Sequence, residues 1–169
     1  MRINTSRFGE IEVKESEWIL MKGAILGFES RSRFVLLIHD KSTPLWWLQS
    51  IDDPDLAFVV ANPCVLMPDY NPAMDEGDLA FLDIKTADDI ALLAIVSVRS
   101  HPFRVTANLR APILINVAER TANQVILNEP DYPIQYDVIS NRAVVDMDLP
   151  EGCKGMEGPG RLAAIAAAI

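Results

Sequence analysis

The chain has 169 residues, the usual size of one domain, and it can bury a hydrophobic core without disulfides or bound metal. Hydrophobic residues make up 50% of the sequence and charged residues 23%, which excludes extensive disorder. The net charge of −9 disfavours binding to nucleic acid or to an anionic membrane and would attract a basic protein partner.

The two cysteines and the apolar segments indicate where the protein resides. Cys64 and Cys153 are too far apart in sequence for a zinc motif, so thiols in a reducing compartment are expected. The N-terminus lacks the apolar core of a signal peptide. The longest largely apolar run, Ile90–Val98, is shorter than the roughly 20 residues that cross a bilayer. We therefore expect a cytoplasmic protein that does not enter membranes.

Short β-branched and aromatic segments, separated by Gly, Pro, Asn or Asp, recur along the chain and are typical of strands. In the first, Glu10–Lys14, polar and apolar residues alternate, which places Ile11 and Val13 on one face. The other expected strands are Trp18–Met21, Arg33–Ile38, Leu45–Ile51, Ala57–Ala61, Ile90–Val98, Phe103–Leu109, Ile113–Val117 and Gln124–Leu127. Many short strands with few helices predict a barrel or a sandwich.

One helix is expected after Asp75. The Asp75 carboxylate can accept a hydrogen bond from the first helical turn, Asp78 favours the positive end of the helix dipole, and Leu79 and Leu82 share a face. Gly77 opposes this helix because glycine has a low helix propensity.

The composition changes near residue 150. Alternation over residues 143–149 predicts one more strand, in a hairpin that turns at Ser140 and Asn141. From Gly152 onward glycines are frequent, and the last nine residues are too few for an isolated helix, which needs about 12. The sequence thus predicts a domain at residues 1–150 and a flexible Gly/Ala-rich tail at residues 151–169.

The residues that usually perform catalysis are scarce. His39 follows an expected strand, and His101 precedes Pro102, which favours an extended turn. Cys64 has no adjacent cation or histidine that would activate its thiol. We therefore expect no enzymatic activity, no catalytic residue and no cofactor.

Three carboxylates lie close together at Asp52, Asp53 and Asp55, with Pro54 between them. Such a group could bind calcium or magnesium, which would make a metal-dependent hydrolase the minor alternative. Aspartate and proline are also the residues that build turns. We expect a turn and no bound metal.

An acidic stretch follows, in which Lys85 is the single cation. Its carboxylates are those of Asp69, Asp75, Glu76, Asp78, Asp83, Asp88 and Asp89. Two interpretations stay open. The stretch is either a solvated face, as charge runs usually are, or a docking surface with Phe81 or Met74 as its apolar centre.

Several sequence blocks together resemble the FliW family. The most specific is Trp46–Phe58, with the sequence WWLQSIDDPDLAF, and Thr106–Ile113, with TANLRAPI, is the next. Shorter matching blocks are Arg7–Ile11, Gly27–Glu29, Pro68–Tyr70, Ala94–Val96, Ile115–Asn116 and Gln124–Leu127. The resemblance covers residues 1 to about 132.

This resemblance implies an all-β protein, a small, partly open antiparallel β-barrel with one or two short helices. It also implies a cytoplasmic, non-enzymatic flagellar assembly factor, which we expect to be a monomer. Such a factor binds flagellin and sequesters the translational regulator CsrA, and thereby relieves repression of flagellin translation. The alternative within the same resemblance is a flagellin chaperone that does not bind CsrA.

Candidate partner-binding residues come from the matching blocks and from the acidic stretch. The full set is Gln49, Asp52, Asp53, Asp55, Asp69, Tyr70, Asp75, Glu76, Asp78 and Asn108. Pro112 also lies in a matching block, but a proline there fits the start of a strand.

Overall fold

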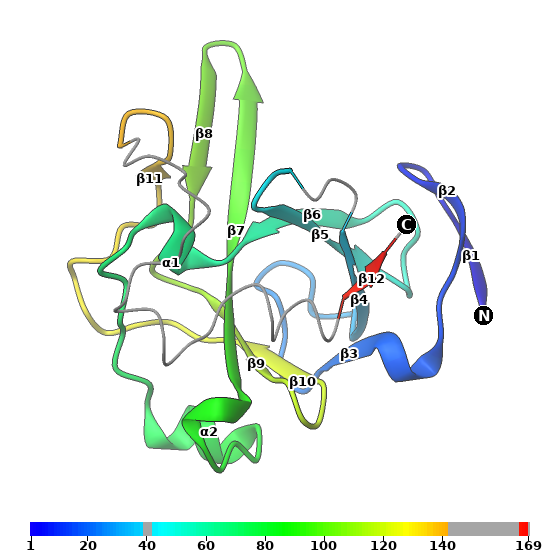
Figure 1. Cartoon of the computed structure of the whole chain (residues 1–169), viewed down its shortest axis with the longest axis horizontal. Coiled ribbons are helices and arrows are strands. Elements are labelled where there is room, and N and C mark those ends of the chain that lie inside the picture. Colours follow the sequence, from blue (N-terminus) through cyan, green and yellow to red (C-terminus); the bar gives the residue numbers. More distant parts are fainter. Residues whose placement is uncertain (39–41, 142–165, 169) are drawn as a thin grey trace.

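The fold is that of a computed structural model, which describes residues 1–38, 42–141 and 166–168. Strands dominate it (Figure 1). They are β1 (Arg2–Thr5), β2 (Gly9–Glu12), β3 (Trp18–Met21), β4 (Arg33–Ile38), β5 (Leu45–Ser50), β6 (Ala57–Ala61), β7 (Ile90–Ser100), β8 (Phe103–Ala107), β9 (Ile113–Asn116), β10 (Thr121–Gln124), β11 (Tyr136–Asp137) and β12 (Ala167–Ala168). The α-helices are α1 (Pro63–Leu66) and α2 (Glu76–Phe81), and the 3-10 helices are η1 (Glu15–Glu17) and η2 (Ala87–Asp89). The expected all-β fold with short helices is confirmed.

Strand pairing runs in a ring. The order β7–β6–β5–β4–β3–β10–β9 returns to β7, because the first half of this long strand also pairs with β9. The pairing of β10 with β3 is parallel, and so is that of β12 with β4, whereas the other pairs are antiparallel. The sheet is therefore closed at β7–β9, and it departs from a purely antiparallel arrangement at β3 and β4.

Strand β4 is apolar along its length because both of its faces are covered. Phe34 and Leu36 point into the interior cluster with Leu48, whereas Val35 and Leu37 pack in a second cluster under the β1–β2 hairpin. A strand buried on both faces needs a continuous apolar run rather than alternation. This explains why the run Arg33–Ile38 predicted the observed strand to the residue.

Strand β7 has the same double burial over its first half only. Leu93 packs in the interior cluster, and Leu92 and Ala94 pack in an outer cluster with Tyr70 and Leu82. From Ser97 onward the strand is largely exposed, and with β8 it forms a hairpin that extends beyond the barrel (Figure 1). The buried part of β7 therefore ends at Val96, two residues before the end of the apolar run.

The expected helix is confirmed as α2, with the Asp75 carboxylate accepting a hydrogen bond from the Gly77 N–H at 2.7 Å. Helix α1 was not expected, although Asn62 caps it and Pro63 occupies its first position, as both residue types favour. Strand β10 lies earlier than the expected Gln124–Leu127, because Asn116 folds the preceding turn by accepting hydrogen bonds from the N–H groups of Ala118 and Glu119.

Several expectations concern residues outside those the structure describes. They are the strand at residues 143–149, His39, Cys153 and most of the tail at residues 151–169. The end of the tail is described, and there Ala167 and Ala168 form β12 and pair with Leu37 and Ile38 of β4. Among the described residues, no helix has the length and apolar character needed to span a membrane.

Candidate functional site

The turn at residues 52–55 is held by its own carboxylates. Asp52 accepts hydrogen bonds from the backbone N–H groups of Ser32 and Arg33 at 2.9 and 2.8 Å, and it pairs with the Arg33 guanidinium at 2.6 Å. Burial alone would raise the pKa of Asp52, but these donors and the Arg33 charge together lower it below its ordinary value. Asp52 therefore connects this turn to the start of β4.

Asp52→Asn is expected to destabilise the protein at pH 7 by about 1–3 kcal/mol, because a neutral amide is a weaker acceptor for these donors. The pKa of Asp52 is lowered on folding, so its stabilisation is present above the unfolded pKa and is lost as the pH falls through the folded pKa. Denaturation curves should show the difference shrinking below about pH 4. Asp69→Asn, at an exposed site, is the control, and a pH-independent difference for Asp52→Asn would contradict this role.

The other candidate residues of this block also form hydrogen bonds or ion pairs within the protein. Asp53 pairs with Arg31 at 2.9 Å, and Asp55 accepts a hydrogen bond from the Ser6 hydroxyl at 2.7 Å. The buried Gln49 donates to the carbonyl oxygens of Ser50, Pro54 and Leu56. The side chain of Gln49, a candidate for partner binding, therefore lies inside the protein and shapes the turn.

Tyr70 is likewise buried, and its hydroxyl donates to the Leu109 carbonyl oxygen at 2.8 Å. Burial raises the pKa of Tyr70 above its ordinary value, so it stays a neutral donor. Its ring lies 4.7 Å from that of Tyr132. Tyr70, also a candidate for partner binding, is thus a core residue whose hydrogen bond connects two loops.

The residues of the acidic stretch lie at two separate places in the structure. Asp69 is exposed in the turn after α1, and Figure 1 shows α1 well apart from α2. The other carboxylates belong to α2, to η2 and to the segment between them. We call this second group the acidic surface, and it consists of Asp75, Glu76, Asp78, Asp83, Asp88 and Asp89.

The acidic surface contains one large exposed apolar side chain. Phe81 ends α2 and is 47% exposed, whereas Met74 is partly buried against the outer cluster. Burial raises the pKa of Asp78, and the charge of Asp75 adds to this rise, while the hydrogen bond and charge of Lys22 lower the pKa of Asp83. The acidic surface thus combines carboxylates with one exposed aromatic side chain, and Lys22 donates to both Asp83 and the Phe81 carbonyl oxygen.

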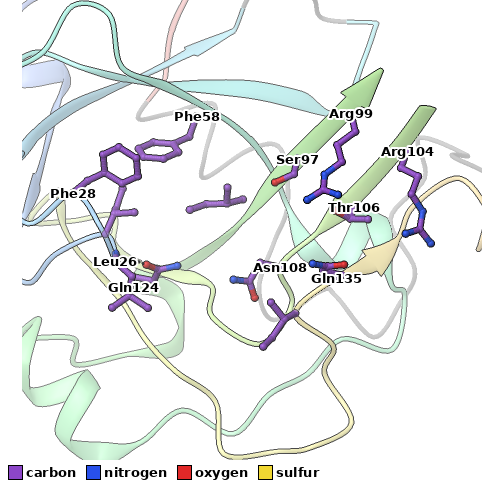
Figure 2. A pocket seen from close by; sticks show the side chains of 13 residues that line it. Leu26, Phe28, Phe58, Ser97, Arg99, Arg104, Thr106, Asn108, Gln124 and Gln135 are labelled. Carbon is purple, nitrogen blue, oxygen red and sulfur yellow. Dashed lines mark hydrogen bonds between the residues drawn. The ribbon is translucent and has the colours of Figure 1, made fainter. Parts of the chain in front are cut away.

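A groove of about 340 Å³ lies beside the β7–β8 hairpin (Figure 2). Of the ten candidate residues, only Asn108 lines it. The Asn108 side chain accepts hydrogen bonds from the N–H groups of Arg110 and Ala111, so it also holds the turn after β8. The groove was not predicted, because its walls come from segments that are far apart in sequence. The available signal was a lack of acidic residues across residues 90–118, which contain Arg99, Arg104 and Arg110.

Metal ligands do not gather in the described part of the chain, in which no three His, Cys, Asp or Glu side chains are grouped so that they could hold an ion. The carboxylates of Asp52, Asp53 and Asp55, which were the metal alternative, are hydrogen-bonded to Arg33, Arg31 and Ser6. Cys64 is buried, and its thiol lies 3.5 Å from the Tyr70 carbonyl oxygen.

Comparison with known proteins gives consistent matches. The family model described as FliW protein matches residues 2–138. A flagellar assembly factor FliW from Syntrophus aciditrophicus is 49% identical over 142 residues, which cover 84% of this chain and 90% of that protein. The one from Geobacter sulfurreducens is 37% identical, with 85% and 89% covered.

A solved structure agrees with these sequence matches. A crystal structure of the flagellar assembly factor FliW superposes with a TM-score of 0.75 at 36% sequence identity, covering 82% of this chain and 96% of that one. The family model spans most of the chain, and the relatives match along nearly their whole length. The chain therefore belongs to the FliW family.

Proposed function

We propose that this protein is a cytoplasmic flagellar assembly factor that binds flagellin, sequesters CsrA and has no enzymatic activity. The observation that carries the proposal is the 49% identity to a flagellar assembly factor over 84% of the chain. By sequestering CsrA, the protein relieves repression of flagellin translation. It acts as a monomer and does not bind nucleic acid directly.

The acidic surface is the region we assign to CsrA. A regulator that binds messenger RNA needs a basic surface, and a chain with a net charge of −9 attracts such a partner over a distance of a Debye length. Phe81 offers the apolar contact that charges alone do not provide. Of the candidate residues, Asp75, Glu76 and Asp78 belong to this surface. Asp75 and Asp78 also have roles within α2, so Glu76 is the cleaner position to test.

Glu76→Lys is expected to lower the association rate constant with CsrA roughly two- to fivefold and to reduce its dependence on salt. Stopped-flow mixing between about 50 and 300 mM salt, where the screening length falls from roughly 14 to 6 Å, measures both effects. Glu15→Lys makes the same charge change at an exposed position on η1. Equal rate losses for the two variants would show that net charge matters and the acidic surface does not.

The partner set is tested by mixing the purified protein separately with flagellin and with CsrA and measuring a Kd for each. Binding to both supports the proposal. Binding to flagellin alone would leave a flagellin chaperone that does not bind CsrA. Binding to neither would overturn the proposal, whatever the family relationship.

A further inference from the structure

The groove beside the β7–β8 hairpin has one charged end. Ser97 and Arg99 of β7 and Arg104 and Thr106 of β8 line it, and Figure 2 shows the two arginines on neighbouring strands at this end. In the antiparallel register Arg99 is directly opposite Arg104. Opposed side chains share a face of the hairpin, and like charges in this position are destabilising. The hairpin therefore holds two guanidinium groups in an arrangement that its own stability disfavours.

Among the residues that the structure describes, little negative charge offsets this pair. Arg104 approaches Asp137 only to 3.9 Å, and its side chain is 57% exposed. Within the described residues Arg99 forms no ion pair. The acidic surface around α2 lies at the opposite end of the molecule from the hairpin tip (Figure 1). The charged end of the groove is thus a local basic site on an acidic protein.

Beyond its charged end, the groove is lined by large apolar side chains, several of them exposed, and by the amides of Asn108, Gln124 and Gln135. Leu26 and Ile134 are 61% and 62% exposed, and Phe28 packs edge-to-face on Phe58 at 5.0 Å between ring centres. Phe58 and Ile95 contact the interior cluster, so the floor of the groove is continuous with the core. Large apolar side chains that line a groove and stay exposed are typical of an interaction site.

The walls are fixed before any partner arrives. The Gln124 side chain accepts a hydrogen bond from the Leu26 N–H at 2.9 Å and donates to the Ala111 carbonyl oxygen at 3.0 Å. Arg110 donates to the carbonyl oxygens of Pro130 and Tyr132, which holds the segment that leads to Ile134. A site with prearranged walls loses less conformational entropy on binding.

We propose that this groove binds a peptide segment of a partner protein in which carboxylate side chains lie next to large apolar ones. The carboxylates pair with Arg99 and Arg104, and the apolar side chains contact Leu26, Phe28 and Ile134. Bidentate pairing with carboxylates is what the planar guanidinium group favours. The inference goes beyond the proposed function, because its partner segment is opposite in charge to the one expected at the acidic surface.

A library of displayed random 12-residue peptides, selected on the immobilised full chain, tests this proposal. The selected peptides should be enriched in both Asp or Glu and Leu, Ile or Phe relative to the starting library. Fluorescence anisotropy then gives the Kd of the most enriched peptide as a labelled synthetic probe. Failure to select any peptide, or selection of peptides without carboxylates, would overturn the proposal.

Two variants test the charged end and the apolar wall of the groove separately. Arg99→Glu should raise the Kd of the probe about tenfold or more, and Leu26→Ser should also weaken binding. Lys85→Glu makes the same charge change at an exposed position outside the groove and should leave the Kd within about twofold of wild type. Equal effects of Arg99→Glu and Lys85→Glu would contradict the proposed site.

Two further measurements, of melting temperature and of oligomeric state, complete the test. Arg99→Glu puts a carboxylate opposite Arg104, so its melting temperature should be equal to or higher than that of wild type, and lost binding then cannot be unfolding. Sedimentation measures the oligomeric state of the wild-type protein and of Leu26→Ser. It tests whether the groove is occupied by a second copy of this chain. A wild-type dimer that Leu26→Ser dissociates would overturn the proposal in favour of self-association.

Discussion

Phe34→Ala is expected to lower the free energy of unfolding by about 3–5 kcal/mol, the largest effect of any change discussed above. Phe34 is fully buried in β4, where it packs in the interior cluster with Leu36 and Leu48, and its ring is 6.3 Å from that of Phe58. The strands of the closed sheet surround Phe34, so neighbouring side chains have little freedom to collapse into the cavity that the substitution leaves. The loss therefore includes a cavity term in addition to the lost burial.

Phe103→Ala is the matched control, because the same ring is 66% exposed at the tip of the β7–β8 hairpin. Phe103→Ala should lower the free energy of unfolding by no more than about 0.5 kcal/mol. Urea denaturation followed by tryptophan fluorescence measures both variants. A loss below about 1 kcal/mol for Phe34→Ala would show that the interior cluster is not the main core of the barrel.

Gln49→Glu is expected to cost about 3–5 kcal/mol at pH 7, although the two side chains have nearly the same shape. The Gln49 amide donates to the carbonyl oxygens of Ser50, Pro54 and Leu56 at 2.9, 3.2 and 3.0 Å. A carboxylate has no proton to donate, so the variant would place a buried negative charge against these oxygens. The cost should decrease as the pH is lowered, because a protonated carboxyl group regains one donor.

Gln135→Glu, at an exposed position, controls for the charge itself and should change the free energy of unfolding by less than about 0.5 kcal/mol. Denaturation curves of both variants at pH 7 and pH 4 give the comparison. Equal stabilities of Gln49→Glu and wild type at pH 7 would mean that the turn at residues 52–55 does not depend on Gln49.

The bounds of three strands were predicted to the residue. Strands β3, β4 and β6 begin and end as expected, because an apolar run bounded by polar residues or turn formers is visible locally. Strand β12 could not be predicted, since its two alanines favour a helix by propensity and pair with β4 only through tertiary structure. Closure of the sheet through β7 and β9 is equally invisible in a local pattern.

The candidate residues were harder to predict than the fold. The WWLQSIDDPDLAF block marks the family, but sequence cannot distinguish residues that build a turn from residues that touch a partner. The hydrogen bonds of Gln49 and Asp52 end within the protein, so both residues help to build the turn. The groove was missed for a different reason: Leu26, Arg99 and Ile134 meet only after the strands have paired.

The proposed function requires that flagellin control the availability of this protein for CsrA. A typical interface covers about 800 Å² on each partner, a large share of the surface of one small domain, so two partners are expected to affect one another. Thermodynamic linkage then makes the effect reciprocal, and each partner weakens binding of the other by the same factor. Export of flagellin would thereby free the protein to capture CsrA.

Calorimetric titration of CsrA into the protein, with and without saturating flagellin, tests this most directly. We predict that flagellin raises the apparent Kd for CsrA at least about tenfold, which corresponds to a coupling free energy of roughly 1.4 kcal/mol. Equal Kd values in the two titrations, together with a stable complex of all three proteins, would contradict the switch.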